Sequence, residues 1–470
     1  MARIPRGSGT FFRLGPAENG KAGCFAVRRG DARSVLNAIV LHSELQGDLK
    51  ALTRCGYPIG TIGDMLAVVQ DGLHGVRRYV AKGVPLIGVG DVTEDGVDLT
   101  EVNRITGEEH ERLQASHVMR GDLLVTITGR LGTAALYDSD EPANLSAHVA
   151  LCRAKAGYEL LYLKHYLASR FGAASMMRAQ IGSTHAHINV RRLVELPIPL
   201  PPRSLQQKLA NSMEEARGVR RAKLAQADER FANLDEFVLK TVGLIPPRKD
   251  ERKTFAVRRA DAQRQRHLNA NYYHPERVLA LRAMEKEIPG VSYKPLAEVV
   301  SFIREQIKTP GANYLSLANV QSNTGERVPA AEEAVGGCST FQENDVLFAR
   351  LRPYLNKVYR AESGGCCSPE FHVLRTKDSA ALGPDYLAAI LRSSVVVAQT
   401  RHMTTGNTHP RLTNDDVANL VIPIPTPAVQ ERIALEVRRC REEARKLRAD
   451  AEAGWQVAKQ EFEERLLGNS

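Results

Sequence analysis

The chain has 470 residues, enough for about three domains of ordinary size. Its composition, 43% apolar and 25% charged, is that of a globular protein, and no apolar run is long enough to predict a membrane-spanning helix. The formal charge of +10 and the pI near 9.2 favour a polyanionic partner such as nucleic acid over an incidentally basic surface.

The cysteines and the N-terminus indicate the cellular compartment. Seven cysteines form an odd set without a Cys-x-x-Cys pair, which argues against a disulfide framework and against a zinc ribbon. The first 24 residues are basic but lack the apolar segment of a secretion signal. We therefore expect a cytoplasmic protein with reduced thiols, and we expect residues 1–24 to form a basic arm of unassigned role.

In chain order, the first elements recur later in the chain. FAVRRGDAR at Phe25 returns as FAVRRADAQ at Phe255. Short apolar runs closed by polar turns, near Pro85 and near Asn313, are typical of buried strands. RGDLLVTITGRLGTAALY, which ends at Tyr137, matches ENDVLFARLRPYLNKVYR, and both indicate a β-hairpin with a basic turn.

The next segment gives the clearest repeat. GSTHAHINVRRLVELPIPLPPRSLQQKLA begins at Gly182, and GNTHPRLTNDDVANLVIPIPTPAVQERIA begins at Gly406. Matched residues of these two segments lie 224 positions apart, whereas earlier matches range from 222 to 230. Offsets drift in this way when loops differ in length and structural elements do not. The sequence therefore predicts two copies of one unit.

Each copy ends in a long helix with an apolar seam. Apolar and small residues recur at steps of three and four after Ser204 and again after Pro427, and charged residues fill the other faces. Gly243 and the prolines that follow it end the first helix. Helices of this length span on the order of 55–60 Å, which favours a spacer over a helix that covers the core of its own domain.

These features, in this order, resemble the specificity subunits of type I restriction–modification systems, the HsdS family. A recognition unit, a Gly-x-Thr-His segment that leads to a Pro-rich turn with a glutamine, and a long helix follow one another twice. FARLRPYLNKVY and NYYHPERVL in the second copy are similar to that family's recognition units, whereas the first copy has TGRLGTAALY and NAIVLHSEL there. The resemblance covers nearly everything from Phe25 to Leu467.

The resemblance implies an α+β fold with two tandem homologous mixed α/β target-recognition domains. Two long α-helices separate the domains and form an antiparallel coiled coil, which gives the chain pseudo-two-fold symmetry. The implied divisions are an N-terminal basic arm (1–24), target-recognition domain 1 (25–202), spacer helix 1 (203–245), target-recognition domain 2 (246–426) and spacer helix 2 (427–470).

The resemblance also implies a non-catalytic subunit that recognises a bipartite double-stranded DNA target. It docks two adenine methyltransferase subunits, with restriction and translocase subunits as optional partners and no membrane. The chain contains neither the cofactor nor the catalytic motif of an adenine methyltransferase, and no P-loop. We expect no cofactor of its own, and S-adenosylmethionine on the methyltransferase. Two alternatives stay open: a target-recognition subunit of another DNA-modification or phage-defence system, and an assembly scaffold that does not bind DNA.

Candidate DNA-binding residues lie in the hairpin turns and in the Gly-x-Thr-His segments. Basic turn residues contact phosphate more often than bases, and the alternative is a solvated turn. The Thr-His pairs either contact DNA or tie down a structural turn. His187 has no histidine counterpart in the second copy, so no metal site is expected. The candidates are Arg130, Thr184 and His185 in the first copy, and Arg350, Arg352, Tyr354, Asn356, Lys357, Thr408 and His409 in the second.

Overall fold

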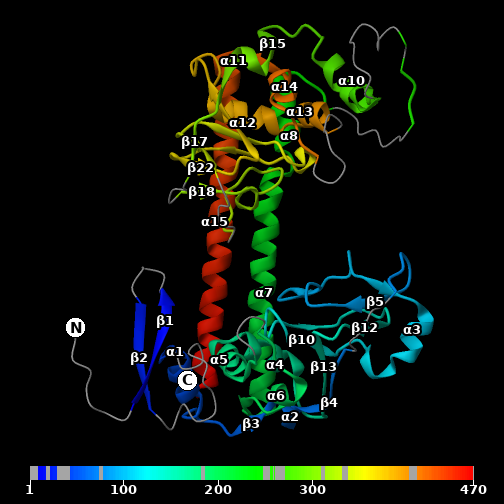
Figure 1. Cartoon of the computed structure of the whole chain (residues 1–470), viewed down its shortest axis with the longest axis vertical. Helices are drawn as coiled ribbons and strands as arrows, with labels where there is room; N and C mark the ends of the chain where they lie inside the picture. Colours follow the sequence, from blue (N-terminus) through cyan, green and yellow to red (C-terminus); the bar gives the residue numbers. More distant parts are fainter. Residues whose placement is uncertain are drawn as a thin grey trace. The chain divides into compact units, whose positions relative to one another are not determined.

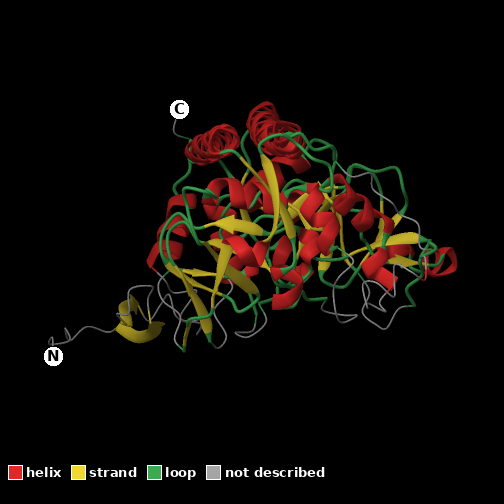
Figure 2. Ribbon diagram, turned by 90° about the horizontal axis from the view of Figure 1, so that it is seen from above, coloured by secondary structure: helices red, strands yellow, loops and turns green. Residues whose placement is uncertain are grey.

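The computed structural model describes residues 9–16, 22–28, 43–72, 78–181, 186–246, 254–257, 259, 270–308, 313–330, 337–401 and 410–468. The chain divides into two compact units, Met1–Arg221 with Glu452–Ser470 and Ala222–Ala451. Each unit combines helices and strands (Figure 2). Among the described residues, no helix is both long enough and apolar enough to span a membrane.

Two four-stranded sheets form the centre of the first unit (Figure 1). One has the order β11-β10-β13-β4, with every neighbouring pair antiparallel. The other has the order β8-β5-β12-β9, in which β5 and β12 are parallel. The strands are β4 Leu66–Asp71, β5 Val84–Ile87, β8 Arg104–Ile105, β9 His117–Val118, β10 Leu123–Thr126, β11 Ala134–Leu136, β12 Ala143–Leu145 and β13 Val149–Ala154.

The second unit repeats this strand order. Its sheets have the orders β21-β20-β23-β16 and β18-β22-β19-β17, and β18 and β22 are again the parallel pair. One edge differs, because β8 joins β5 in the first unit whereas β17 joins β19 in the second. The shared order confirms the predicted duplication. The strands are β16 Val300–Ile303, β17 Gln306–Ile307, β18 Tyr314–Leu315, β19 Cys338–Phe341, β20 Val346–Ala349, β21 Val358–Arg360, β22 Gly365–Cys367 and β23 Phe371–Thr376.

Helices and short elements complete both units. The first unit has α1 Ser43–Leu52, α2 Ile62–Met65, α3 Gly107–Arg112, α4 Leu160–Ala168, α5 Arg170–Ala179, α6 Val190–Val194, η1 Gln114–Ser116 and the small hairpin β6 Val92–Thr93 and β7 Gly96–Val97. The second has α10 Pro275–Ala283, α11 Leu296–Val299, α12 Pro384–Arg392, α13 Ser394–Thr400, α14 Asn414–Ala418, η2 Ala270–Tyr273, η3 Leu317–Asn319 and η4 Pro353–Leu355.

The repeated Pro-rich segment forms the joint between each domain and its long helix. In the first unit β14, Pro197–Pro199, pairs with β3, Ile59–Thr61, and in the second β24, Val421–Pro425, pairs with β15, Val291–Pro295. Buried tyrosines donate to the carbonyls of these strands, Tyr162 at 2.8 Å and Tyr386 at 2.7 Å. The repeated glutamines donate to the preceding proline carbonyls, Gln206 at 2.8 Å and Gln430 at 2.9 Å. The Pro-rich segment and its glutamine, the most specific part of the repeat, therefore hold each domain to its long helix.

The two long helices, α7 Arg203–Ala232 and α15 Pro427–Leu466, contact each other within both units, as predicted. In the first unit, Leu209 and Met213 share an apolar cluster with Trp455 and Phe462. In the second unit two ion pairs join them, Arg448 with Asp228 at 2.8 Å and Arg230 with Glu443 at 3.3 Å. Residues later in α7 contact residues earlier in α15, so the two helices run antiparallel.

The first predicted helix is interrupted near its end. The α7 helix stops at Ala232, and α8, Leu234–Val242, begins after Asn233, a residue type that favours helix starts. Ser394 N donates to Asp235 at 2.8 Å, and α8 joins the apolar core of the second unit. As expected, Gly243 ends the helix, with a φ of +92°.

At the N-terminus, strands β1 Gly9–Pro16 and β2 Ala22–Arg28 form an antiparallel pair. The second strand crosses the predicted boundary between the basic arm and the first recognition domain. The domain boundaries otherwise stay predictions.

Candidate nucleic-acid interface

The first recognition turn, residues 126–133, joins strands β10 and β11. The strands are almost fully buried, whereas Gly129 and Arg130 at the tip of the turn are exposed. Gly129 has a φ of +71°, a backbone region that glycine adopts without strain. The Thr126 hydroxyl bonds the Arg130 carbonyl and accepts from Thr133 N at 3.1 Å. The hairpin therefore fixes the backbone that presents Arg130 to solvent.

The second recognition turn, residues 350–357, joins strands β20 and β21. Arg352 and Tyr354 are exposed there, Tyr354 by 44%. Arg352 and Asn356 have φ values of +48° and +52°, which residues other than glycine rarely adopt. Such positions persist where surrounding contacts hold them, and they gather at functional sites. The turn thus presents one cation and one aromatic ring on a constrained backbone.

Each Gly-x-Thr-His segment leads to a residue that contacts a recognition turn. Residues 182–185 and 402–409 lie outside the described residues. The predicted contacts that fall on them are Thr184, His185, Thr408 and His409. The Ala186 carbonyl accepts from Gly129 N at 3.2 Å, and the Pro410 carbonyl accepts from Arg352 N at 2.8 Å. In both copies the chain therefore leaves this segment directly beside the tip of the turn.

Two residues of the second turn that are predicted to contact DNA form hydrogen bonds within the unit instead of pointing freely to solvent. Asn356 is 9% exposed, and its amide donates to the Arg392 carbonyl at 2.9 Å and to Asn323 Oδ1 at 3.3 Å. Lys357 is half-buried, and its Nζ donates to the Leu317 carbonyl at 2.7 Å. Both side chains shape the turn, so their contact with DNA stays a prediction beside this structural role.

Arg350 lies at the inner end of the second turn and is half-buried. Its Nε is enclosed without a hydrogen-bond acceptor among the described atoms. Burial, followed by the charge of Arg350, lowers the pKa of His372 to about 4. Because the Arg350 guanidinium is partly withdrawn from solvent, it is a poorer candidate for first contact with DNA than Arg352.

An ion pair beside the second turn has no counterpart among the sequence predictions. Arg411 donates to both carboxylate oxygens of Glu370, and the Nη2–Oε1 distance is 2.7 Å. Arg411 follows the Gly-x-Thr-His segment and Glu370 precedes β23, so the pair ties that segment to the sheet. The two residues are 41 positions apart, and no local pattern in the sequence links them.

Comparison with known proteins gives one family. A model described as the type I restriction modification DNA specificity domain matches residues 77–216. The EcoDI specificity subunit of Escherichia coli is 21% identical over 266 residues, which are 53% of this chain and 56% of that protein. The E. coli EcoBI specificity subunit is 25% identical over 139 residues, 29% of each chain. The matched part thus spans about half of the first relative and under a third of the second.

Among solved structures, a chain from a study of complex assembly and conformational transition in the type I restriction–modification system is similar. It is 17% identical with a TM-score of 0.47, over 88% of this chain and 98% of that one. The family-model match gives the chain a DNA specificity domain. Residues 77–216 are thus similar to the DNA specificity domain of type I restriction–modification systems, and both relatives are specificity subunits of type I restriction enzymes.

Proposed function

We propose that this chain is the DNA specificity subunit of a type I restriction–modification complex. Each unit recognises one half of a bipartite duplex target, and the chain performs no catalysis itself. Adenine methyltransferase subunits, two in number, dock on it and bring S-adenosylmethionine. Restriction and translocase subunits are optional further partners. We place the complex in the cytoplasm, as for the family that the chain resembles.

One observation carries the proposal. In both copies, the tip of an exposed basic turn is hydrogen-bonded to the chain that leaves a Gly-x-Thr-His segment, through Gly129 and Ala186 and through Arg352 and Pro410. In both copies the described residue that follows the Gly-x-Thr-His segment therefore contacts a turn that the sequence predicts independently as a DNA contact. A turn that presents an exposed arginine offers donors to phosphates and to base edges. The net charge of +10 favours approach to DNA.

The long helices support the bipartite target. An antiparallel helix pair joined to two copies of one unit supports a pseudo-two-fold arrangement within one chain, and DNA-binding dimers use such symmetry to contact two half-sites. In this proposal α7 and α15 set the gap between the half-sites. Because the copies differ in sequence at the recognition turns, the two half-sites also differ.

Salt-dependent binding to duplex DNA tests this function. We predict that the logarithm of affinity falls with the logarithm of salt concentration with a slope of about −5, which corresponds to roughly six phosphate contacts. Arg130→Ala and Arg352→Ala should each make the slope shallower by about one. The measurement is fluorescence anisotropy of a labelled duplex with the full chain in complex with its methyltransferase.

The matched control is Arg120→Ala. Arg120 is exposed and pairs with Asp138 at 2.7 Å, at the end of β10 away from the recognition turn. This variant should leave the slope unchanged. A slope near zero for the unmodified chain would contradict DNA recognition and favour the scaffold alternative.

A further inference from the structure

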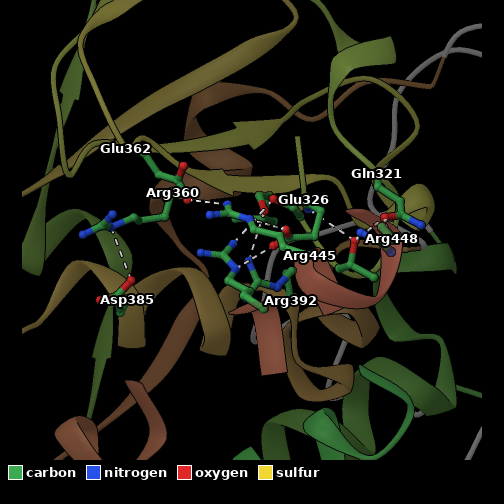
Figure 3. Close-up of polar contacts among 12 residues, drawn as sticks. Gln321, Glu326, Arg360, Glu362, Asp385, Arg392, Arg445 and Arg448 are labelled. Atoms are coloured by element: carbon green, nitrogen blue, oxygen red, sulfur yellow. Dashed lines mark hydrogen bonds and ion pairs between the residues drawn. The ribbon is translucent and has the colours of Figure 1, made fainter. Parts of the chain in front are cut away.

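An acidic residue of the second unit is enclosed by arginines of helix α15. Glu326 is 2% exposed, and its Oε1 lies 2.8 Å from Arg441 Nε. Its Oε2 lies 3.2 Å from Arg445 Nε (Figure 3). Arg441 is itself buried, and its Nη2 donates to the Gly325 carbonyl at 3.5 Å. Two arginines one helical turn apart thus hold one hairpin, residues 320–327, which we call the second clamp hairpin.

The first unit has a corresponding contact, in which two arginines of the long helix bond backbone carbonyls of a hairpin, whereas those of the second unit bond a buried carboxylate. Arg217 Nη1 donates to the Glu94 carbonyl at 3.0 Å, and Arg221 Nη2 donates to the Asp95 carbonyl at 3.3 Å. These carbonyls belong to the turn between β6 and β7, the first clamp hairpin, residues 92–97. Each arginine of one pair lies 224 positions from its counterpart in the other, which is also the offset of the Thr-His pairs.

The second clamp hairpin is bonded in turn to the second recognition turn. Asn323 N donates to the Asn356 carbonyl at 3.1 Å, and the Asn356 amide donates back to Asn323 Oδ1 at 3.3 Å. Asn356 is one of the two left-handed residues of that turn. An unbroken path of polar contacts therefore runs from Arg441 on the long helix through the clamp hairpin to the turn that carries Arg352.

Close backbone packing fixes the same path. A Cβ atom added at Gly325 would lie 2.0 Å from the Val358 carbonyl oxygen in β21, so only glycine fits there. The buried Arg392 guanidinium donates to the same carbonyl at 3.1 Å, and its own carbonyl accepts from Asn356. In the first unit the clamp hairpin packs on β10 and β11, the strands that carry the first recognition turn.

We propose that the pairs Arg217/Arg221 and Arg441/Arg445 are positioning residues for DNA recognition. Each pair fixes the recognition turn of its own unit to the long helix, and so determines how strictly that unit discriminates between its half-site and near matches. This inference rests on the proposed function. It adds that specificity depends on helix residues that do not contact DNA.

The main test replaces the buried ion pair by neutral amide side chains, Glu326→Gln with Arg441→Gln. Methylome sequencing of cells that carry the chain with its methyltransferase measures methylation at cognate sites and at sites with one mismatch. Arg130→Ala and Arg352→Ala identify which half-site each unit recognises. For mismatches in the half-site of the second unit, the ratio of cognate to mismatched methylation should fall about tenfold. The other half-site should keep its ratio.

Two controls separate positioning from general destabilisation. Glu436→Gln with Arg439→Gln removes an exposed ion pair of 2.6 Å from the same helix, and should change neither ratio. Arg221→Gln loosens the clamp of the first unit, and should relax the other half-site only. If the double variant does not fold, Arg445→Gln takes its place, because it alters a half-exposed side chain. It should lower the same ratio by a smaller factor.

Hydrogen exchange on the same proteins tests the clamp independently of methylation. Amides of residues 350–357 should exchange faster in the Glu326/Arg441 variant and not in the Glu436/Arg439 variant. Unchanged exchange, unchanged ratios, or an equal loss of discrimination in both half-sites would each overturn the clamp. If the unmodified complex deposits no bipartite methylation pattern, the proposed function fails instead, and exchange alone decides the clamp.

Discussion

The Glu214 carboxylate on helix α7 accepts hydrogen bonds from two buried side chains of α4, a histidine and a lysine. His165 Nε2 lies 2.8 Å and Lys164 Nζ 2.9 Å from the same carboxylate oxygen, and Arg217 pairs with the other oxygen. At the position 224 residues further on, the charge is reversed, because Arg438 of α15 pairs with Asp385 of α12 at 3.2 Å. In both copies an ion pair thus joins the long helix to its domain at this position, but the acidic and basic partners are exchanged.

The cluster predicts acid sensitivity of the first unit. Burial raises the pKa of Glu214, but hydrogen bonds from His165 and Lys164 and the nearby charges outweigh it and lower the pKa to about 2. A carboxyl with a depressed folded-state pKa stabilises the fold above its ordinary pKa, and this contribution is lost as the pH falls toward 2. Burial also lowers the pKa of His165, so the unfolded chain binds a proton at this residue more readily than the folded one. This second contribution begins to destabilise the unit below about pH 6.5.

Glu214→Gln should therefore lower the free energy of unfolding at pH 7 by about 2 kcal/mol and flatten its decline between pH 4.5 and 2. The one tryptophan of the chain, Trp455, is buried in the first unit, so its fluorescence during urea unfolding reports this unit. The neighbouring exposed Glu215→Gln is the control. Equal pH profiles for the two variants would show that the cluster does not stabilise the unit.

At the scale of elements, the sequence predicts what is local or repeated. Hairpins, the Pro-rich joint and the long helices all follow from patterns that occur twice, and the strand orders agree with them. The break at Asn233 is not predicted, since it depends on the docking of α8 in the second unit. The internal contacts of Asn356 depend on a partner 33 positions away. The clamp arginines occupy charged helix faces, which sequence patterns assign to solvent.

The proposed spacer role of the helices gives a prediction about length. Seven residues inserted after Arg221 in α7 and seven after Ala451 in α15 lengthen both helices by about 10 Å and nearly keep their faces in phase. The gap between half-sites should grow by about three base pairs. Methylome sequencing measures that gap directly.

The control for this experiment is insertion of the seven residues in α7 alone. It shifts the register of pairs such as Asp228 with Arg448, so the helices should unpair and methylation should be lost. If the paired insertion leaves the gap unchanged while methylation persists, α7 and α15 do not set the spacing.

At the scale of the whole molecule, one chain contains two copies of the same structural unit. A symmetric dimer presents identical surfaces and favours palindromic sites, whereas two copies fused in one chain are free to diverge. The turns have diverged here, with a glycine-rich turn around Arg130 and a left-handed turn around Arg352. Two divergent units that each bind one half-site therefore predict an asymmetric target in two parts.

Methylome sequencing of cells with the unmodified chain, Arg130→Ala or Arg352→Ala, each with the cognate methyltransferase, tests this claim most directly. We predict adenine methylation at two different short sequences separated by a fixed gap. Arg130→Ala should relax one of them, and Arg352→Ala the other. A single continuous motif, or both substitutions relaxing the same half, would contradict the account.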